Sequence, residues 1–122
     1  MNLDETIIAV SAPSGLSVKT LIRMCGPAAF DGCRTLCGLP EARILEKKQF
    51  SLGNQSLPVM VAAFGAEQSY TGQDTVEIQC PNNTYLTDRM IQRIIEVTGG
   101  RLAEAGEFTA RAFFNGRLTL SE

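Results

Sequence analysis

The side chains that could do chemistry in this 122-residue chain are better suited to binding than to catalysis. The sequence contains no histidine, which removes Ser-His-Asp and Cys-His catalysis together with the commonest general base near neutral pH. No phosphate-binding P-loop is present, because Val18 stands where that pattern needs a glycine before Lys19 and Thr20. We therefore expect no catalytic residues and no turnover from this chain alone.

The four cysteines are the chain's candidate nucleophiles and metal ligands. Cys25, Cys33 and Cys37 cluster in the sequence, but they form no CxxC pair, and a zinc site would have to join them to the distant Cys80. We expect no metal site and instead four reduced, partly buried thiols.

Three charged side chains suggest a ligand that has a planar ring and an anionic tail. Glu77 lies between Val76 and Ile78 on an expected strand, where it either points to solvent or accepts hydrogen bonds from the amidine-like edge of a ring such as a pterin or guanine. Taken one at a time, Arg23 and Arg117 are interpreted as ordinary charged residues on the surface. Together they could hold the carboxylates of a ligand tail.

The elements that must position these residues predict an α+β fold with a mixed β-sheet and flanking helices. Strands and helices alternate irregularly, and a hairpin connected by residues 53–56 lies in the middle, which argues against a doubly wound parallel sheet. The clearest helix has Leu86, Met90, Ile94 and Val97 on one face. Expected strands or extended segments are 6–11, 19–24, 43–52, 57–64, 75–79 and 101–103, expected turns include 12–15, and expected helices are 27–37, 84–97 and 108–114.

Length and composition fit one domain with a single core, since 44% of the residues are hydrophobic and 20% are charged. The net charge of −2 provides no overall positive field for nucleic acid, so such contacts would need a local patch or other parts of a longer protein. No apolar run approaches the roughly 18 residues of a membrane helix, and the N-terminal residues do not resemble a signal peptide. We expect a cytoplasmic protein without a membrane partner.

Three segments resemble the N-terminal domain of the bacterial tRNA-modification GTPases called MnmE or TrmE. Residues 69–78, SYTGQDTVEI, resemble the family's S-F/Y-T-G-E-D-x-V/L-E-I/L, and residues 106–118, GEFTARAFFNGRL, resemble its G-E-F-T-x-R-A-F-x-N-G-K/R-L. Residues 6–9 and 22–27 resemble its D-T-I-x-A and I-I/V-R-L/I/V-S-G-P segments. The segments occur in the family's order and spacing, and they span almost the whole chain.

The resemblance implies that residues 1–118 are a folate-binding and dimerisation domain, similar in fold to the folate-binding domain of glycine-cleavage T proteins, and that residues 119–122 begin a truncated helical domain. It implies binding of 5-formyltetrahydrofolate or 5,10-methylenetetrahydrofolate and formation of a homodimer. Full-length members use GTP, magnesium and potassium in a GTPase domain outside these residues. With a flavin-dependent partner called MnmG or GidA, they modify carbon 5 of the wobble uridine in tRNA to the carboxymethylaminomethyl type.

The resemblance also implies which residues contact folate: the family's contact positions correspond to Arg23, Glu77 and Arg117 of this sequence. The sequence departs from the family at Leu16 and Val18, which replace parts of a glycine-rich turn, and at residues 79–83, where QCPNN replaces H-G-H-G-G. The family's L-D-L reads LTL at residues 118–120. Two alternatives therefore stay open: a divergent dimerisation scaffold that no longer binds folate, and a fragment of a folate-dependent aminomethyltransferase that shares only the fold.

Overall fold

A computed structural model describes residues 2–11, 19–41 and 44–117 of the chain. The turn expected at residues 12–15, the substitutions at Leu16 and Val18, the LTL segment and the helical start expected at 119–122 lie outside the described residues.

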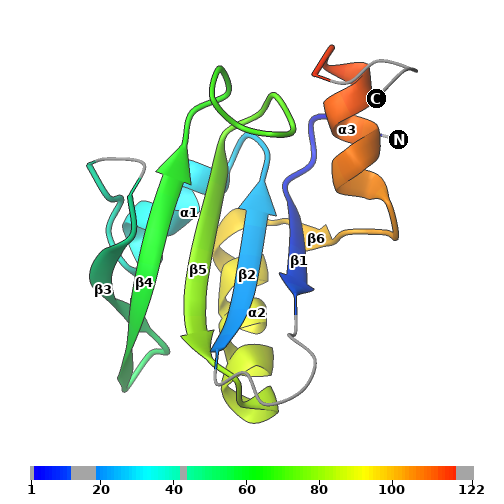
Figure 1. Cartoon of the computed structure of the whole chain (residues 1–122). Coiled ribbons are helices and arrows are strands. Elements are labelled where there is room, and N and C mark those ends of the chain that lie inside the picture. The colour runs from blue at the N-terminus through cyan, green and yellow to red at the C-terminus, as the bar shows by residue number, and fades with distance from the viewer. Residues whose placement is uncertain (1, 12–18, 42–43, 118–122) are drawn as a thin grey trace.

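One six-stranded sheet runs through the molecule in the order β3-β4-β5-β2-β1-β6 (Figure 1). The pair β1–β6 is parallel and the other neighbouring pairs are antiparallel, so the predicted mixed sheet is confirmed. The strands are β1 (Ile7–Ser11), β2 (Lys19–Cys25), β3 (Glu46–Ser51), β4 (Ser56–Phe64), β5 (Thr75–Pro81) and β6 (Arg101–Leu102).

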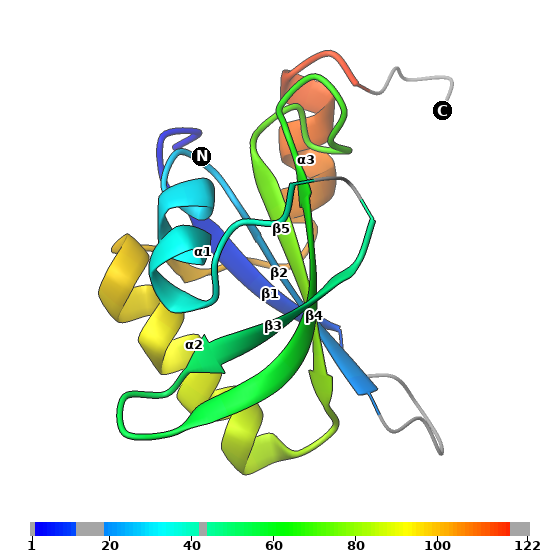
Figure 2. The ribbon, with the colours of Figure 1, turned by 90° about the vertical axis from the view of Figure 1, so that its left-hand side faces the viewer.

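Two helices, α1 (Ala29–Leu36) and α2 (Thr84–Thr98), cover one face of this sheet, and α3 (Glu107–Phe114) lies beyond one end of it (Figure 2). Gly32 brings α1 close to α2, because a Cβ atom added there would lie 2.4 Å from Cγ2 of Thr98. Within the described ranges, no helix is long and apolar enough to cross a membrane.

The predicted helix stripe forms the α2 contribution to the core. Met90 and Ile94 are fully buried, and Leu86 and Val97 are partly buried against the same core. The helix begins where the side chain of Asn83 accepts a hydrogen bond from the Leu86 amide at 3.0 Å, an N-cap that satisfies one of the unpaired amides of the first turn.

The predicted hairpin is also confirmed, since the Leu52 amide donates to the Gln55 carbonyl at 2.8 Å where β3 turns into β4. Strands β2 and β4 are each one residue longer than predicted, and β5 is two residues longer. β5 continues to Pro81 rather than stopping at Gln79.

The alternation of side chains along β2 and β5 divides them between two environments. Ile22 and Ile78 are fully buried in the core beneath the helices. Arg23 follows Ile22 and Glu77 precedes Ile78, so both of these side chains point to the opposite face of the sheet. The predicted orientation of Glu77 away from Val76 and Ile78 is therefore confirmed, and this face carries the candidate site.

Candidate functional site

Arg23 and Glu77 occupy directly opposite positions on the antiparallel strands β2 and β5. Nε and Nη2 of Arg23 donate to Oε2 of Glu77 at 2.8 and 2.5 Å. The two side chains remain 39% and 24% exposed, so the ion pair is open to a ligand as well as to water. Among the described residues, Oε1 of Glu77 has no hydrogen-bond donor, and it could accept from a ligand while Arg23 holds the carboxylate in place.

This ion pair forms part of the wall of a cavity of about 190 Å³ between the sheet and the loop of residues 65–74. The ring of Phe108 on α3 lies 5.8 Å from the guanidinium carbon of Arg23, an arrangement that steadies the cation. Two aromatic side chains, hydroxyl groups and an amide line the rest of the cavity, which comprises Arg23, Phe64, Gln68, Ser69, Tyr70, Thr71, Thr75 and Glu77.

The loop over the cavity is built by the SYTGQD segment. The Ser69 hydroxyl donates to the Gln73 carbonyl at 2.5 Å and accepts from the Gly72 amide at 3.1 Å. Oδ1 of Asp74 accepts from the Ala66 amide at 3.1 Å, which closes the loop at its base. Gly72 has φ +80°, and an added Cβ would lie 2.7 Å from Cβ of Asn115, so glycine is required both by conformation and by space.

Arg117, the third predicted ligand contact, lies against the same loop but is not among the residues that line the cavity. Its Nη2 donates to the Ala66 carbonyl, and the neighbouring Asn115 amide donates to the Thr71 carbonyl at 2.9 Å. The structure therefore brings Arg23 and Glu77 together and places exposed Arg117 at the loop.

A buried arginine that sequence reasoning did not select connects three distant segments. Arg111 on α3 is 0% exposed, and its guanidinium donates to Oε1 of Gln73 at 2.8 Å and to the Asn2 carbonyl at 3.1 Å. Gln73 in turn donates to the Leu3 carbonyl at 2.7 Å. Nε of Arg111 is the one buried side-chain nitrogen or oxygen in the described ranges without a partner.

Glu107 completes this network from the first turn of α3. Its carboxylate accepts from Arg101 at 2.7 and 2.8 Å and from Arg111 at 3.4 Å, and Arg101 also contacts Glu5. The Arg101 guanidinium lowers the pKa of Glu107 to about 2, while Glu107 raises the pKa of Arg101. The four-residue spacing of Glu107 and Arg111 within the GEFTAR segment is the signal that could have predicted this pair.

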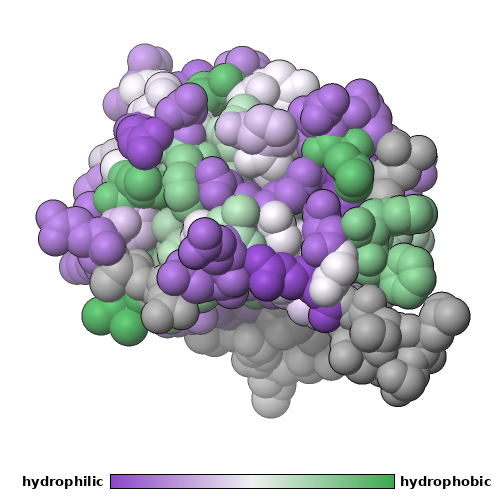
Figure 3. Space-filling view, turned by 90° about the horizontal axis from the view of Figure 1, so that it is seen from above, coloured by the Kyte–Doolittle hydropathy of each residue, from purple (hydrophilic) through white to green (hydrophobic). Residues whose placement is uncertain are grey.

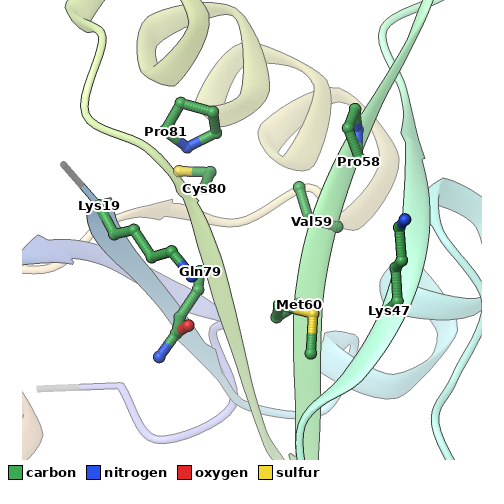
Figure 4. A pocket seen from close by; sticks show the side chains of 8 residues that line it. All are labelled: Lys19, Lys47, Pro58, Val59, Met60, Gln79, Cys80 and Pro81. Atoms are coloured by element: carbon green, nitrogen blue, oxygen red, sulfur yellow. The ribbon is translucent and has the colours of Figure 1, made fainter.

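Viewed from the end that carries α3 and the loop, the visible surface mixes hydrophilic side chains with separate hydrophobic patches (Figure 3). A second hollow, of about 230 Å³, lies further along the sheet and includes three of the residues that depart from the family pattern (Figure 4). It holds two lysines but no carboxylate, so it lacks the acceptor that an amidine-like edge requires. Its walls are Lys19, Lys47, Pro58, Val59, Met60, Gln79, Cys80 and Pro81.

The part of the chain that the structure describes contains no group of three or more side chains arranged to hold a metal ion. Its four cysteines are all free thiols, of which Cys37 is partly exposed and the others are buried.

Comparison with known proteins matches residues 6–117 to the family described as GTP-binding protein TrmE N-terminus. The chain belongs to this TrmE N-terminal family. The match includes Arg23, Glu77 and Arg117 as well as the buried Glu107–Arg111 pair, so the residues that line the cavity and the centre of the network beside it lie within the matched segment.

Curated relatives in the family are named tRNA modification GTPase MnmE. The chain is 35% identical to that of Flavobacterium johnsoniae over 97% of its length and 37% identical to that of Christiangramia forsetii over 100%. The relative from Wolinella succinogenes is 37% identical over 97% of the chain. The chain spans about a quarter of the length of these relatives, 26–27% in each case.

Proposed function

We propose that this domain binds a one-carbon tetrahydrofolate, either 5-formyltetrahydrofolate or 5,10-methylenetetrahydrofolate, in the cavity beside Arg23 and Glu77. The observation that carries the proposal is the half-exposed carboxylate of Glu77, which is held by Arg23 on the wall of a partly aromatic cavity. A carboxylate fixed in this way can accept a hydrogen bond at its other oxygen, Oε1, from the planar edge of a pterin ring.

The size of the cavity favours the ring over the whole molecule. At about 190 Å³ it is smaller than the roughly 300–1,000 Å³ of pockets that enclose drug-sized ligands, so the tail of a folate would extend outside it. Arg117 is exposed and lies at the loop that covers the cavity, which makes it the proposed cation for that tail. When bound, the folate would supply a one-carbon unit, and the residues of this chain would orient the ring and shield one side of it.

We further propose that the domain forms a homodimer and works within a full-length cytoplasmic protein. With GTP, magnesium and potassium bound elsewhere and with the MnmG or GidA partner, that protein would modify the wobble uridine of tRNA at carbon 5. The names of the relatives and the family match over residues 6–117 support this role. In the described residues, the sheet face opposite α1 and α2 has no helix packed along it, and it is the surface that we propose for dimerisation (Figure 2).

A dimerisation scaffold without folate is the second candidate. Arg23 and Glu77 already neutralise each other, so their presence does not require a ligand. The replacement of the family's glycine-rich segment by residues 79–83 also favours a changed binding surface.

Calorimetric titration of the 122-residue chain with 5-formyltetrahydrofolate separates these candidates. We expect saturable binding that Glu77→Gln weakens by about 10- to 100-fold, because a hydrogen bond to a charged group contributes about 1.5–3 kcal/mol. Glu96→Gln, an exposed change on α2, is the matched control and should bind like the parent. A parent that dimerises in sedimentation but takes up no folate supports the scaffold; equal binding by parent and Glu77→Gln removes Glu77 from ring recognition.

A further inference from the structure

Two thiols meet at the end of α1, on the helix-covered side of the sheet and away from the cavity. Sγ of Cys33 and Sγ of Cys37 are 3.7 Å apart. Cys33 is fully buried in the core, whereas Cys37 is partly exposed. Cys37 is therefore the more accessible residue of the two.

The backbone explains how the sulfurs come so close. In a regular helix, Cβ atoms four residues apart are about 5–6 Å from each other, which exceeds the roughly 3.5–4.5 Å found across a disulfide. Cys37 is the C-cap of α1, and its backbone, with φ −148° and ψ −2°, is no longer helical. The amides of Cys37 and Gly38 both donate to the Cys33 carbonyl at 2.9 Å, which holds this turn in place.

The surroundings of the pair give the two sulfurs different reactivities. The hydrogen bond between the two thiols and the nearby ammonium of Lys48 lower the pKa of Cys37, against the effect of its burial. The same hydrogen bond and burial raise the pKa of Cys33. Lys48 lies on β3, and its Nζ is 3.6 Å from Oε2 of Glu46. Lys48 and Arg34 on α1 are the basic groups whose charge lowers the pKa of Cys33, against the larger opposite effects. Cys37 is thus the attacking sulfur and Cys33 the resolving one.

The other two cysteines lack such a neighbour. Cys25 donates to Oε1 of Gln73 at 3.5 Å, and Cys80 donates to the Thr20 carbonyl at 3.6 Å. Both are buried, and burial raises the pKa of each thiol. They are expected to stay reduced under conditions in which the α1 pair reacts.

We propose that Cys33 and Cys37 form a redox-active dithiol that small-molecule disulfides such as oxidised glutathione convert into an internal disulfide. The Cys37 thiolate attacks one sulfur of the reagent, a mixed disulfide forms, and one glutathione thiolate leaves. Cys33 loses its proton to solvent and attacks Sγ of Cys37, which releases the second glutathione thiolate. Two protein thiols are oxidised by two electrons, and one glutathione disulfide is reduced to two thiols.

The test equilibrates the folded 122-residue chain with reduced and oxidised glutathione, quenches it with acid, alkylates the remaining thiols in denaturant and measures intact mass. We expect the parent to lose two of its four alkylatable thiols together, without retained glutathione. Trypsin cuts after Arg34, so the disulfide should join the peptides of residues 24–34 and 35–43. Cys25 lies in the first of these peptides as well, so Cys25→Ala is the control variant and should retain the cross-link. Cys33→Ala and Cys37→Ala should each abolish it.

A matched pair of lysines on β3 tests the assignment of the attacking sulfur. Lys48→Met should slow the first exchange step several-fold, whereas Lys47→Met, on the opposite face of the same strand, should leave the rate unchanged. Four free thiols at every glutathione ratio, a cross-link that survives Cys33→Ala, or a product that stops at bound glutathione would each overturn the proposal. None of these outcomes depends on whether the domain binds folate.

Discussion

Two arginine–glutamate pairs lie next to the loop of residues 65–74, and they differ in what surrounds them. Arg111 and Glu107 are 0% and 5% exposed and are bonded to the N-terminal segment, the loop and Arg101. Arg23 and Glu77 are 39% and 24% exposed and, among the described side chains, share hydrogen bonds only with each other.

The difference shows how one pair of residue types acquires two roles. A buried ion pair is difficult to break because water cannot replace the lost partner, so it suits a structural link. A half-exposed pair contributes little to stability because water competes for it, and its acceptor stays accessible to a ligand. In this molecule the buried network holds the loop and α3 against the N-terminal segment, while the exposed pair faces the cavity that the loop covers.

The largest effect should come from Arg111→Met. This change removes the donors to Gln73 and Asn2 and the cation beside the buried carboxylate of Glu107, so we expect the free energy of unfolding to fall by about 3–5 kcal/mol. Urea unfolding followed by circular dichroism measures it. Arg34→Met, which removes an exposed pair with Asp31, is the control and should change stability by less than about 0.5 kcal/mol. A loss below about 1 kcal/mol for Arg111→Met would contradict the structural role of the buried network.

Acid should weaken the same network by a slightly smaller amount. The folded-state pKa of Glu107 is lowered to about 2, below the usual value of about 4.3 for an unfolded chain. Its stabilising contribution is therefore fully present above the unfolded-state pKa and is lost as pH falls through the folded-state pKa. We expect the stability difference between the parent and Glu107→Gln to narrow as pH falls from about 5 to about 2.

Urea titrations at a series of pH values measure this narrowing. Glu96→Gln, whose carboxylate is exposed beside Arg93, should differ from the parent by less than about 0.5 kcal/mol at each pH. If the Glu107→Gln difference is the same at pH 7 and pH 2.5, the carboxylate does not depend on its contact with Arg101.

The smallest effect should come from the exposed pair. A double-mutant cycle on Arg23→Met and Glu77→Gln should give a coupling energy of about 1 kcal/mol or less, because both side chains are accessible to water. Urea unfolding of the parent, the two single variants and the double variant gives this value. A coupling above about 2 kcal/mol would place this pair in the same structural class as the buried network and would remove the contrast between the two regions.

Much of the fold followed from local patterns in the chain. Residues 84–97 carry a helical stripe, and the helix observed there extends by one residue to Thr98. Residues 75–79 alternate, and Glu77 lies on the face opposite Val76 and Ile78 for that reason alone. Such patterns depend on neighbours a few residues away, so they can be identified without knowledge of the remaining structure.

The candidate site was predictable in its charged residues but not in their arrangement. The family segments indicated Arg23, Glu77 and Arg117, and the strand register then placed the first two directly opposite each other. Register depends on the pairing of strands that are 54 residues apart at this point, which no local pattern specifies. The ligand roles of all three residues stay predictions.

The sequence by itself determined the family, the mixed sheet and the face of β5 on which Glu77 lies, because these follow from side-chain periodicity and from the identity of contiguous segments. Only the tertiary structure decided that Arg111 is buried while Arg23 is partly exposed. It also decided that the sulfur of Cys37, at the end of α1, lies next to that of Cys33. Burial and such contacts arise when distant segments pack together, and the same side chain has a different energy and reactivity in each environment.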